Sequence, residues 1–311
     1  MSVVLGVDIG GSHITAALVD LESRTVIPGS RKRKLVDSKA GLEEIIGEWC
    51  EVTREVFKHT VAEDWKVGIA MPGPFDYDKG ICLIKDQDKF QSLYNQNLCN
   101  LLGHHLGIEP HVIKFMNDAA CFLQGEVFGG AARGYNSVIG LTLGTGLGSA
   151  TCRNGIAEDA DLWKSPFKEG IAEDYLSTRW FVDRYKQLSK RTVTGVKELM
   201  DEDSPFVMQL FIEFGTNLGE FLVPQIKANQ AEVVVLGGNI ANALPLFLSP
   251  LEKVTRDNGL HVVLKQALLN EDASLIGAAS CWQEGGIESG VESRESGVWS
   301  RESGVGRKNS L

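Results

Sequence analysis

The sequence predicts an α/β protein made of two similar halves, and three observations lead to this prediction. Short apolar runs typical of buried strands alternate with segments whose apolar residues recur with a helical period. The stretches "VDIGGS" (7–12) and "LTLGTG" (141–146) both place glycines between one apolar strand and the next. The 311 residues, 43% of them hydrophobic, are enough for two packed domains.

Composition disfavours several classes of function. The formal net charge of −10 disfavours nucleic acid binding, which needs a surplus of Lys and Arg on one face. No apolar run approaches the roughly 18 residues of a membrane span, and the start of the chain lacks a basic and hydrophobic leader. The six cysteines include no Cys-x-x-Cys pair, which favours reduced thiols. We therefore expect a cytoplasmic protein with neither a nucleic acid nor a membrane partner.

The first half is expected to open with an antiparallel meander of strands at 3–7, 14–19 and 24–35. The basic run Arg31–Lys34 falls at a strand end, where we expect solvated side chains rather than a polyanion site. Apolar residues from Leu42 to Phe57 share one helical face, which predicts a helix over 41–59. The other expected elements are a strand at 66–72, a short helix at 97–107, a strand at 111–117 and a helix at 118–130.

The second half is expected to be more helical. Ser204 and Pro205 form a good cap and first turn for a long helix. Strands are expected at 137–144, 232–239 and 261–265, and a helix at 274–282. Residues 286–311 contain three copies of a seven-residue unit that starts Glu-Ser-Gly-Val, and this polar composition predicts disorder.

Three glycine loops each follow a buried strand and are candidates for phosphate binding. Glycines allow backbone N–H groups to approach a phosphate chain without a Cβ in the way. The Gly-x-Gly-x-Gly spacing at 144–148 differs from the Gly-x-Gly-x-x-Gly of dinucleotide folds, and a hairpin whose glycines serve only turn geometry is the alternative. The candidate residues are Gly10, Gly11, Ser12, Gly144, Thr145, Gly146, Gly237, Gly238 and Asn239.

Two aspartates at strand ends are candidates for catalysis. Asp8 ends a strand that otherwise reads as buried, where a carboxylate is costly unless it is paired or faces a cation. We expect Asp8 to be oriented toward Mg²⁺ through water, and a capped structural aspartate is the alternative. Asn117 and Asp118 stand where a strand becomes a helix, so Asp118 is either an N-cap or a catalytic residue.

Five motifs occur in order along the chain: "GVDIGGSHITAALVD", "AMPGPFD", "MNDAACFLQGE", "LTLGTGLGSA" and "VVVLGGN". Together they resemble the ROK family of sugar kinases and repressors, within the actin-like ATPase superfamily, over residues 3 to about 282. The resemblance implies two actin-like (ribonuclease H-like) lobes with the active site in the cleft between them. The implied lobes are 1–116 and 117–272, with a helix at 273–284 that returns to the first lobe.

The resemblance also implies roles for single residues. Asp118 matches the general base, which takes the proton of a sugar hydroxyl as that oxygen attacks the γ-phosphate. Asn117 and Gly73 match positions that contact the sugar. The loop at 10–12 matches the first phosphate loop, the loop at 144–146 matches the second, and the loop at 237–239 matches the nucleoside side.

The sequence departs from the family where many members carry a Gly-Glu-x-Gly-His stretch and a zinc-binding cysteine cluster. This chain has "EDADLWKSPFKEGIAEDYLS" there, without His or Cys, so no zinc site is predicted. By resemblance, Glu173 keeps a sugar contact and Asp161 replaces the earlier glutamate. His13 stands where the family has a lysine, and a role as a surface strand residue is favoured for it.

Taken together, these features predict a homodimeric hexose kinase that uses ATP and Mg²⁺, with glucose expected first among the sugars. The missing cysteine cluster and "LTLGTGLGSA" also resemble the polyphosphate-using glucokinase branch, and N-acetylhexosamines are alternative sugars. A sugar-responsive repressor needs a DNA-binding segment before a first strand that is expected at Val3, which disfavours this reading. A non-catalytic sugar sensor is disfavoured because Asp118 and all three loops are present.

Overall fold

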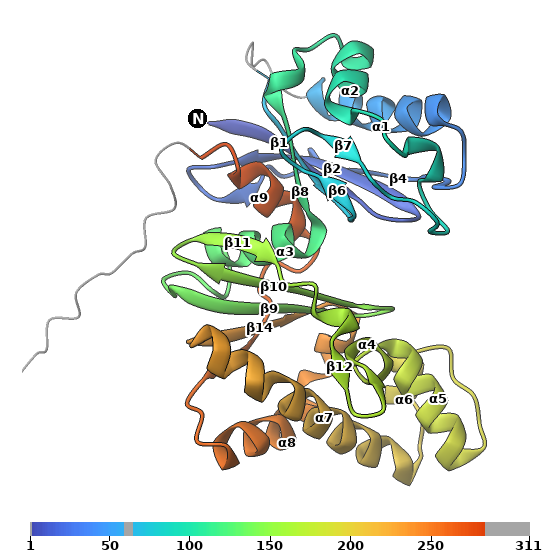
Figure 1. Ribbon diagram of the computed structural model, residues 1–311, viewed down its shortest axis with the longest axis vertical. Helices are drawn as coiled ribbons and strands as arrows, with labels where there is room; N and C mark the ends of the chain where they lie inside the picture. The colour runs from blue at the N-terminus through green and yellow to red at the C-terminus, as the bar shows by residue number, and fades with distance from the viewer. Residues whose placement is uncertain (1, 59–64, 284–311) are drawn as a thin grey trace, which may run out of the picture.

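The computed structural model describes residues 2–58 and 65–283, and the tail expected to be disordered (286–311) lies outside them. Two lobes, each built around one mixed sheet, lie one above the other (Figure 1). Helices cover the outer face of each sheet, and two further helices lie between the sheets. This arrangement confirms the expected fold class, an α/β protein with two lobes.

The first sheet has the strand order β3-β2-β1-β5-β8, with β4 also paired to β2. The strands are β1 (Val3–Ile9), β2 (His13–Asp20), β3 (Thr25–Val26), β4 (Lys32–Leu35), β5 (Val67–Met71) and β8 (Ile113–Asn117). β1 is antiparallel to β2 and parallel to β5, which is parallel to β8. The single strand expected at 24–35 is wrong, because Pro28 and Gly29 (φ +79°) turn the chain between β3 and β4.

On its outer face the first sheet is covered by α1 (Leu42–Phe57) and α2 (Leu98–Leu106). Their apolar faces enclose the core of this lobe, in which Trp49 and Phe90 meet edge to face at a centroid distance of 5.7 Å. A small ribbon, β6 (Phe75–Asp76) and β7 (Ile81–Cys82), lies beside them together with the 3₁₀ turns Gln91–Leu93 and Pro110–Val112. The expected helices and strands of this half are otherwise confirmed.

The second sheet has the order β11-β10-β9-β14-β15. Its strands are β9 (Ser137–Leu143), β10 (Leu147–Arg153), β11 (Ile156–Asp159), β14 (Val233–Gly237) and β15 (Val263–Gln266). β9 is antiparallel to β10 and parallel to β14, just as β1 is antiparallel to β2 and parallel to β5. The two strand-turn-strand units read from the sequence therefore open two sheets of similar design.

Helices of the second lobe pack around an aromatic core in which Phe181 and Phe214 have ring centroids 4.7 Å apart. Ser204 caps α7 by accepting a hydrogen bond from the Phe206 N–H (3.4 Å), with Pro205 in the first turn, as expected. The other elements are β12 (Pro166–Phe167), β13 (Gly170–Ile171), the 3₁₀ turns Leu162–Lys164 and Asn239–Ala243, α4 (Ala172–Tyr175), α5 (Thr178–Ser189), α6 (Val196–Met200), α7 (Pro205–Asn229) and α8 (Leu244–Asp257).

Of the helices in residues 2–58 and 65–283, α7 alone is long and apolar enough to cross a membrane by length and composition. Half of its most apolar window is buried inside the fold, where Leu210, Phe211, Phe214 and Leu218 contribute to the core of the second lobe. We interpret α7 as a core helix, because its apolar face already has a partner in the protein.

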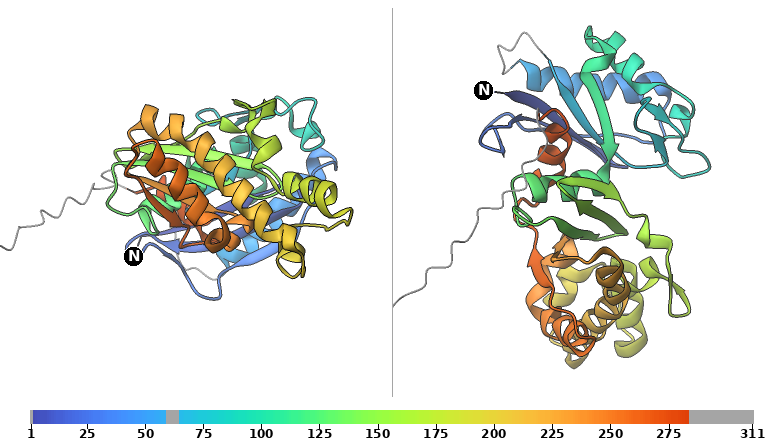
Figure 2. Two further views of the ribbon diagram at one scale, coloured as in Figure 1. Left: turned by 90° about the horizontal axis from the view of Figure 1, so that it is seen from below. Right: turned by 60° about the vertical axis from the view of Figure 1, so that its left-hand side comes forward.

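Two helices lie between the sheets, α3 (Asp118–Phe128) and the returning α9 (Asp272–Ser280), as the right-hand view of Figure 2 shows. The buried Glu126 carboxylate at the end of α3 accepts hydrogen bonds from the N–H groups of Ala131 (2.7 Å), Leu268 (3.1 Å) and Leu269 (2.8 Å), which fixes the segment leading into α9. Part of the basic run also holds this segment, since Arg33 pairs with Glu271 (3.4 Å).

The packing of α9 depends on glycines. At four positions a Cβ would overlap a backbone carbonyl of the neighbouring element, so only glycine allows the observed approach. These contacts are Gly6 of β1 with Leu275, Gly68 of β5 with Ala278, Gly125 of α3 with Ala273, and Gly277 of α9 with Cys121. Main chain therefore packs on main chain from the first sheet through α9 to α3.

Gly277→Ala is expected to destabilise the protein by about 1–3 kcal/mol or more, because the new methyl group would force α3 and α9 apart. Gly47→Ala is the matched control, since Gly47 is an exposed residue of α1 whose Cβ would meet nothing within 4 Å. That control is expected to stabilise by up to about 1 kcal/mol. Urea unfolding measures both, and equal stability of Gly277→Ala and wild type would contradict the close packing.

Candidate active site

Asp118 is the first residue of α3, directly after β8, and its neighbour caps the helix. The Asn117 side-chain oxygen accepts the N–H of Ala120 (3.0 Å), so Asn117 is the N-cap residue. The Asp118 carboxylate accepts the N–H of the adjacent Ala119 (2.8 Å). Of the two roles left open by the sequence, the N-cap is therefore filled by Asn117, and Asp118 retains oxygen atoms for another partner.

Burial raises the pKa of Asp118 above its ordinary value of 3.8. The Ala119 N–H and the charge of Lys89 lower the pKa and offset part of this effect. A carboxylate with a raised pKa is a stronger proton acceptor than one in water, which suits a general base.

Asn117 also joins the two lobes. Its amide donates hydrogen bonds to the Asp159 carboxylate at the end of β11 (3.2 Å) and to the Tyr77 hydroxyl (3.4 Å). The Tyr77 hydroxyl in turn donates to the Met71 carbonyl (3.0 Å) and lies 3.4 Å from the place of a Cβ on Gly73. Gly73 and Asn117, both expected to contact the sugar, are therefore brought together around Tyr77.

Tyr77 and Asp159 were not among the site residues predicted from the sequence. One signal in the sequence could have found Tyr77. It stands in "GPFDY", four residues after the candidate Gly73, which directly follows the strand expected at 66–72. The structure puts Asp159, rather than Asp161, against Asn117. The Asp161 carboxylate pairs with Lys164, and its N–H donates to Asp159 (2.9 Å), so a sugar contact by Asp161 stays a prediction.

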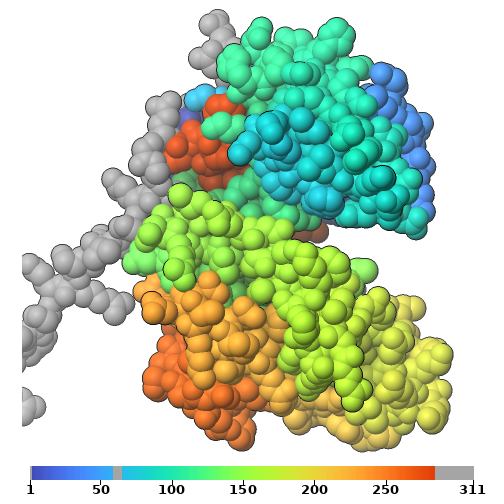
Figure 3. Space-filling model, in the orientation of Figure 1, coloured from blue at the N-terminus to red at the C-terminus, as the bar shows by residue number. Residues whose placement is uncertain are grey.

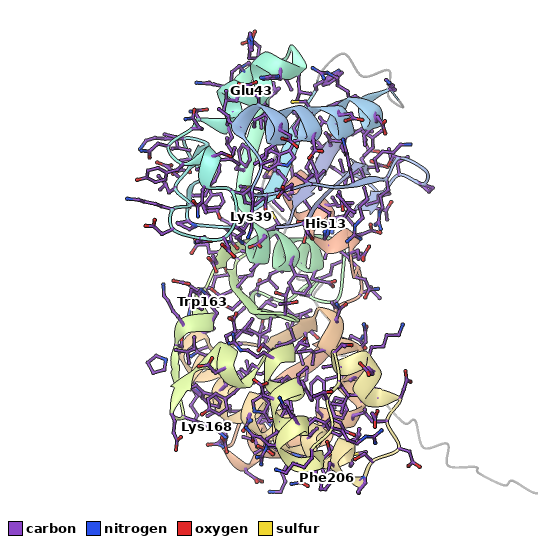
Figure 4. The ribbon with its side chains drawn as sticks, turned by 90° about the vertical axis from the view of Figure 1, so that its right-hand side faces the viewer. His13, Lys39, Glu43, Trp163, Lys168 and Phe206 are labelled. Atoms are coloured by element: carbon purple, nitrogen blue, oxygen red, sulfur yellow. The ribbon has the colours of Figure 1, made fainter. Side chains whose placement is uncertain are left out.

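The first glycine loop turns between β1 and β2, closed by a hydrogen bond from the Gly10 N–H to the His13 carbonyl (2.9 Å). His13 contacts Ser12 (3.0 Å) and Arg33 (2.7 Å) through its ring nitrogens. Its pKa is lowered by burial and by the charge of Arg33. His13 lies at the edge of the first lobe that faces the second, as does Lys39 (Figure 4).

Asp8 is the last residue but one of β1, just before this loop, and is close enough to Asp118 to feel its charge. Burial, and then the negative charge of Asp118, raise the pKa of Asp8 to about 6. In the part of the chain that the structure describes, its carboxylate accepts no hydrogen bond and forms no ion pair. An unpaired carboxylate at a phosphate loop has the donor chemistry that Mg²⁺ prefers, so the residues present fit a magnesium site.

The second and third loops lie together at one end of the second sheet. Gly238 (φ +82°) has no room for a Cβ against the Leu143 backbone, so the third loop packs on the base of the second. The Gly144 carbonyl is held by the N–H and hydroxyl of Thr178 (2.8 and 2.9 Å) at the start of α5. These bonds hold the Gly144 carbonyl against α5. The next residue, Thr145, is exposed at the tip of the second loop.

Glu173 supports the second loop. Its carboxylate accepts the Leu147 N–H (3.0 Å) and lies where a Cβ of Gly146 would fall (2.7 Å). This carboxylate oxygen is already hydrogen-bonded to the hairpin. The sugar contact expected for Glu173 stays a prediction.

No three His, Cys, Asp or Glu side chains within residues 2–58 and 65–283 are grouped so that they could hold a metal ion among them. The absence of a zinc site stays a prediction. Figure 3 shows the surface hollowed between the two lobes, at the right of the view.

Two lobes of repeated design, with glycine loops at the strand ends and a partly buried carboxylate between them, define a protein of the actin-like ATPase fold class. The sequence profile of the ROK family matches residues 4–159, and this chain belongs to the ROK family.

Similar proteins extend over nearly the whole chain. The glucokinase of Thermotoga maritima is 27% identical over 90% of this chain and 97% of its own length. The N-acetyl-D-glucosamine kinase of Histophilus somni is 26% identical, with 88% and 97% covered. The crystal structure of a ROK family glucokinase from Streptomyces griseus in complex with glucose and AMPPNP superposes with a TM-score of 0.71 at 23% identity, covering 90% of this chain and 99% of that one. The chain is thus related to sugar kinases of its family.

Asp8→Asn is expected to stabilise the metal-free protein at pH 8 and not at pH 4. The folded pKa of about 6 lies above the ordinary value of 3.8, so the folded state loses stability as Asp8 ionises with rising pH. The difference corresponds to at most about 3 kcal/mol, measured by urea unfolding at both pH values. An equal gain at both pH values would show that charge is not the cause.

Proposed function

We propose that this protein is a sugar kinase that transfers the γ-phosphate of ATP to a hydroxyl of a hexose, with glucose as the first substrate to test. The observation that carries the proposal is Asp118, a partly buried carboxylate with a raised pKa at the start of α3 that is not used as the helix cap. The related glucokinase and N-acetylglucosamine kinase support a sugar hydroxyl as the acceptor.

In the proposed step, Asp118 accepts the hydroxyl proton while the sugar oxygen forms a bond to the γ-phosphorus. The bond from that phosphorus to the bridging oxygen breaks, and ADP leaves with the electron pair. Asn117, held by Tyr77 and Asp159, would orient the sugar beside Asp118 together with Gly73, Asp161 and Glu173. When Mg²⁺ is bound, through water to Asp8, it supplies positive charge to the phosphate chain.

Glycine loops would bind the phosphate chain and the nucleoside. In this proposal the loop at Gly10, Gly11 and Ser12 and the loop at Gly144, Thr145 and Gly146 bind the phosphates from the two lobes through backbone N–H groups. Gly237, Gly238 and Asn239 lie beside the second loop, where they would contact the ribose and base.

Donor and sugar are tested together. A panel of glucose, mannose, galactose and N-acetylhexosamines, crossed with ATP, GTP and polyphosphate, is scored by the sugar phosphate formed. We expect the highest kcat/KM with glucose and ATP. A preference for polyphosphate or for an N-acetylhexosamine would change the substrate and keep the reaction class, whereas no product from any pair would contradict the proposal and favour a sugar sensor.

Asp118→Asn is expected to lower kcat by at least roughly a hundredfold on the best sugar, because the amide cannot accept the hydroxyl proton. Asp257→Asn, a change of the same kind at an exposed residue of α8, is expected to leave kcat unchanged. Both are measured by coupled ADP release, with urea unfolding as a check on folding. Turnover of Asp118→Asn near that of wild type would exclude Asp118 as the general base.

Three further expectations are part of the proposal. The lobes are 1–116 and 117–272 with the helix 273–284 returning to the first, the protein is a homodimer, and it acts in the cytoplasm. α9 supports the first point, because its backbone packs on β1 and β5 through Gly6 and Gly68. Light scattering of the purified protein tests the second.

A further inference from the structure

Lys89 lies on a segment that is firmly attached to the first lobe. The next residue, Phe90, is fully buried against Trp49, and its N–H donates to the Ser38 carbonyl (2.7 Å). On the other side, Asp88 pairs with Lys39 (3.3 Å), which Figure 4 shows at the edge of the lobe facing the second lobe. The backbone at Lys89 is therefore fixed at the border of the cleft.

From this position the Lys89 side chain reaches the first phosphate loop. Its Cδ atom lies 3.7 Å from the place of a Cβ on Gly11. The ammonium group, two bonds further on, is the positive charge that acts on Asp118. Lys89 thus extends between the loop expected to bind phosphate and the carboxylate expected to take the proton.

The charge of Lys89 is not used by the protein itself. In the described part of the chain, its ammonium forms no hydrogen bond and no ion pair. Other basic groups near the cleft are engaged, since Arg33 pairs with Glu271 (3.4 Å) and Lys164 pairs with Asp161. His13, with its lowered pKa, adds no charge at neutral pH.

The cleft otherwise carries negative charge. Asp118 acts on both Asp8 and Asp159 as a like charge that raises their pKa values. A phosphate chain entering between these carboxylates would be repelled unless cations meet it. An unpaired ammonium between the loop and Asp118 is suited to the phosphoryl group that moves, whose negative charge is spread over its outer oxygens during transfer.

We propose that Lys89 is a further catalytic residue, which binds the outer oxygens of the transferred phosphoryl group from the first lobe. This inference rests on the proposed phosphoryl transfer and adds a contact to it. Lys89 keeps its proton throughout, while the hydroxyl proton goes to Asp118 and the bridging oxygen leaves with the bonding electrons. The ammonium therefore stabilises charge and exchanges no atom.

The test compares Lys89→Met, which removes the charge, with Lys89→Arg, which keeps it. Lys85→Met is the matched control, because Lys85 is an exposed lysine of the same segment whose Nζ lies 5.6 Å from the centre of the Tyr94 ring. For each variant, calorimetry with Mg²⁺ gives the Kd of ADP and of the non-hydrolysable triphosphate AMPPNP. Coupled ADP release gives kcat and the KM of the best sugar.

Lys89→Met is expected to weaken AMPPNP binding at least about tenfold, with little change for ADP, and to lower kcat on the order of a hundredfold at an unchanged sugar KM. Lys89→Arg should recover much of both losses, and Lys85→Met should match wild type. A merely structural lysine would not separate the triphosphate from the diphosphate.

The outcomes separate this inference from the proposed function. If wild type phosphorylates a sugar and Lys89→Met matches it in AMPPNP affinity and kcat, the role of Lys89 is wrong and the kinase stands. If the wild-type protein is inactive on every sugar, but the Lys89→Met variant binds AMPPNP more weakly than wild type does, the phosphate contact stands and the proposed kinase activity is wrong. Wild type that binds neither AMPPNP nor tripolyphosphate would overturn both.

Discussion

The contact on which the rest of this structure depends is the crossing of α3 and α9, where backbone packs directly on backbone. Gly125 and Gly277 allow the two helices to meet, and Gly6 and Gly68 allow α9 to lie on β1 and β5. α3 begins with Asp118, and Asp8 is the last residue but one of β1. These glycine contacts therefore set the distance between the proposed base and the first phosphate loop, and a residue with a larger side chain could not make them.

A second constraint is electrostatic. The cleft gathers Asp8, Asp118 and Asp159, and burial raises the pKa of each, while the negative charge of Asp118 raises the pKa values of Asp8 and Asp159 further. Such a cluster costs stability in the empty protein, and cations that accompany a bound phosphate chain would offset that cost. Strain of this kind is typical of functional sites and makes the site selective for ligands that bring positive charge with them.

Much of the site was accessible from local sequence, and its connections were not. The glycine loops and Asp118 follow apolar strands. Because β1, β5 and β8 are parallel, as are β9 and β14, the residues that follow them gather at one edge of each sheet. Tyr77, Asp159 and Lys89 stand in segments without regular period, and each contacts a site residue at least 40 positions away along the chain. These partners are Asn117 for Tyr77 and for Asp159, and Gly11 for Lys89. Spacing along the chain carries no record of such contacts.

The sequence by itself determined the two-fold plan of strands and helices, the three loops and the family motifs, because strand and helix periods and glycine turns are local properties of the chain. Only the tertiary structure decided that Asn117 caps α3 and leaves Asp118 available, that Asp159 rather than Asp161 meets Asn117, and that Glu173 braces the second loop. The physical reason is that each of these roles is a competition among neighbouring polar groups for the same donors, and packing between distant segments determines which group is close enough to bind.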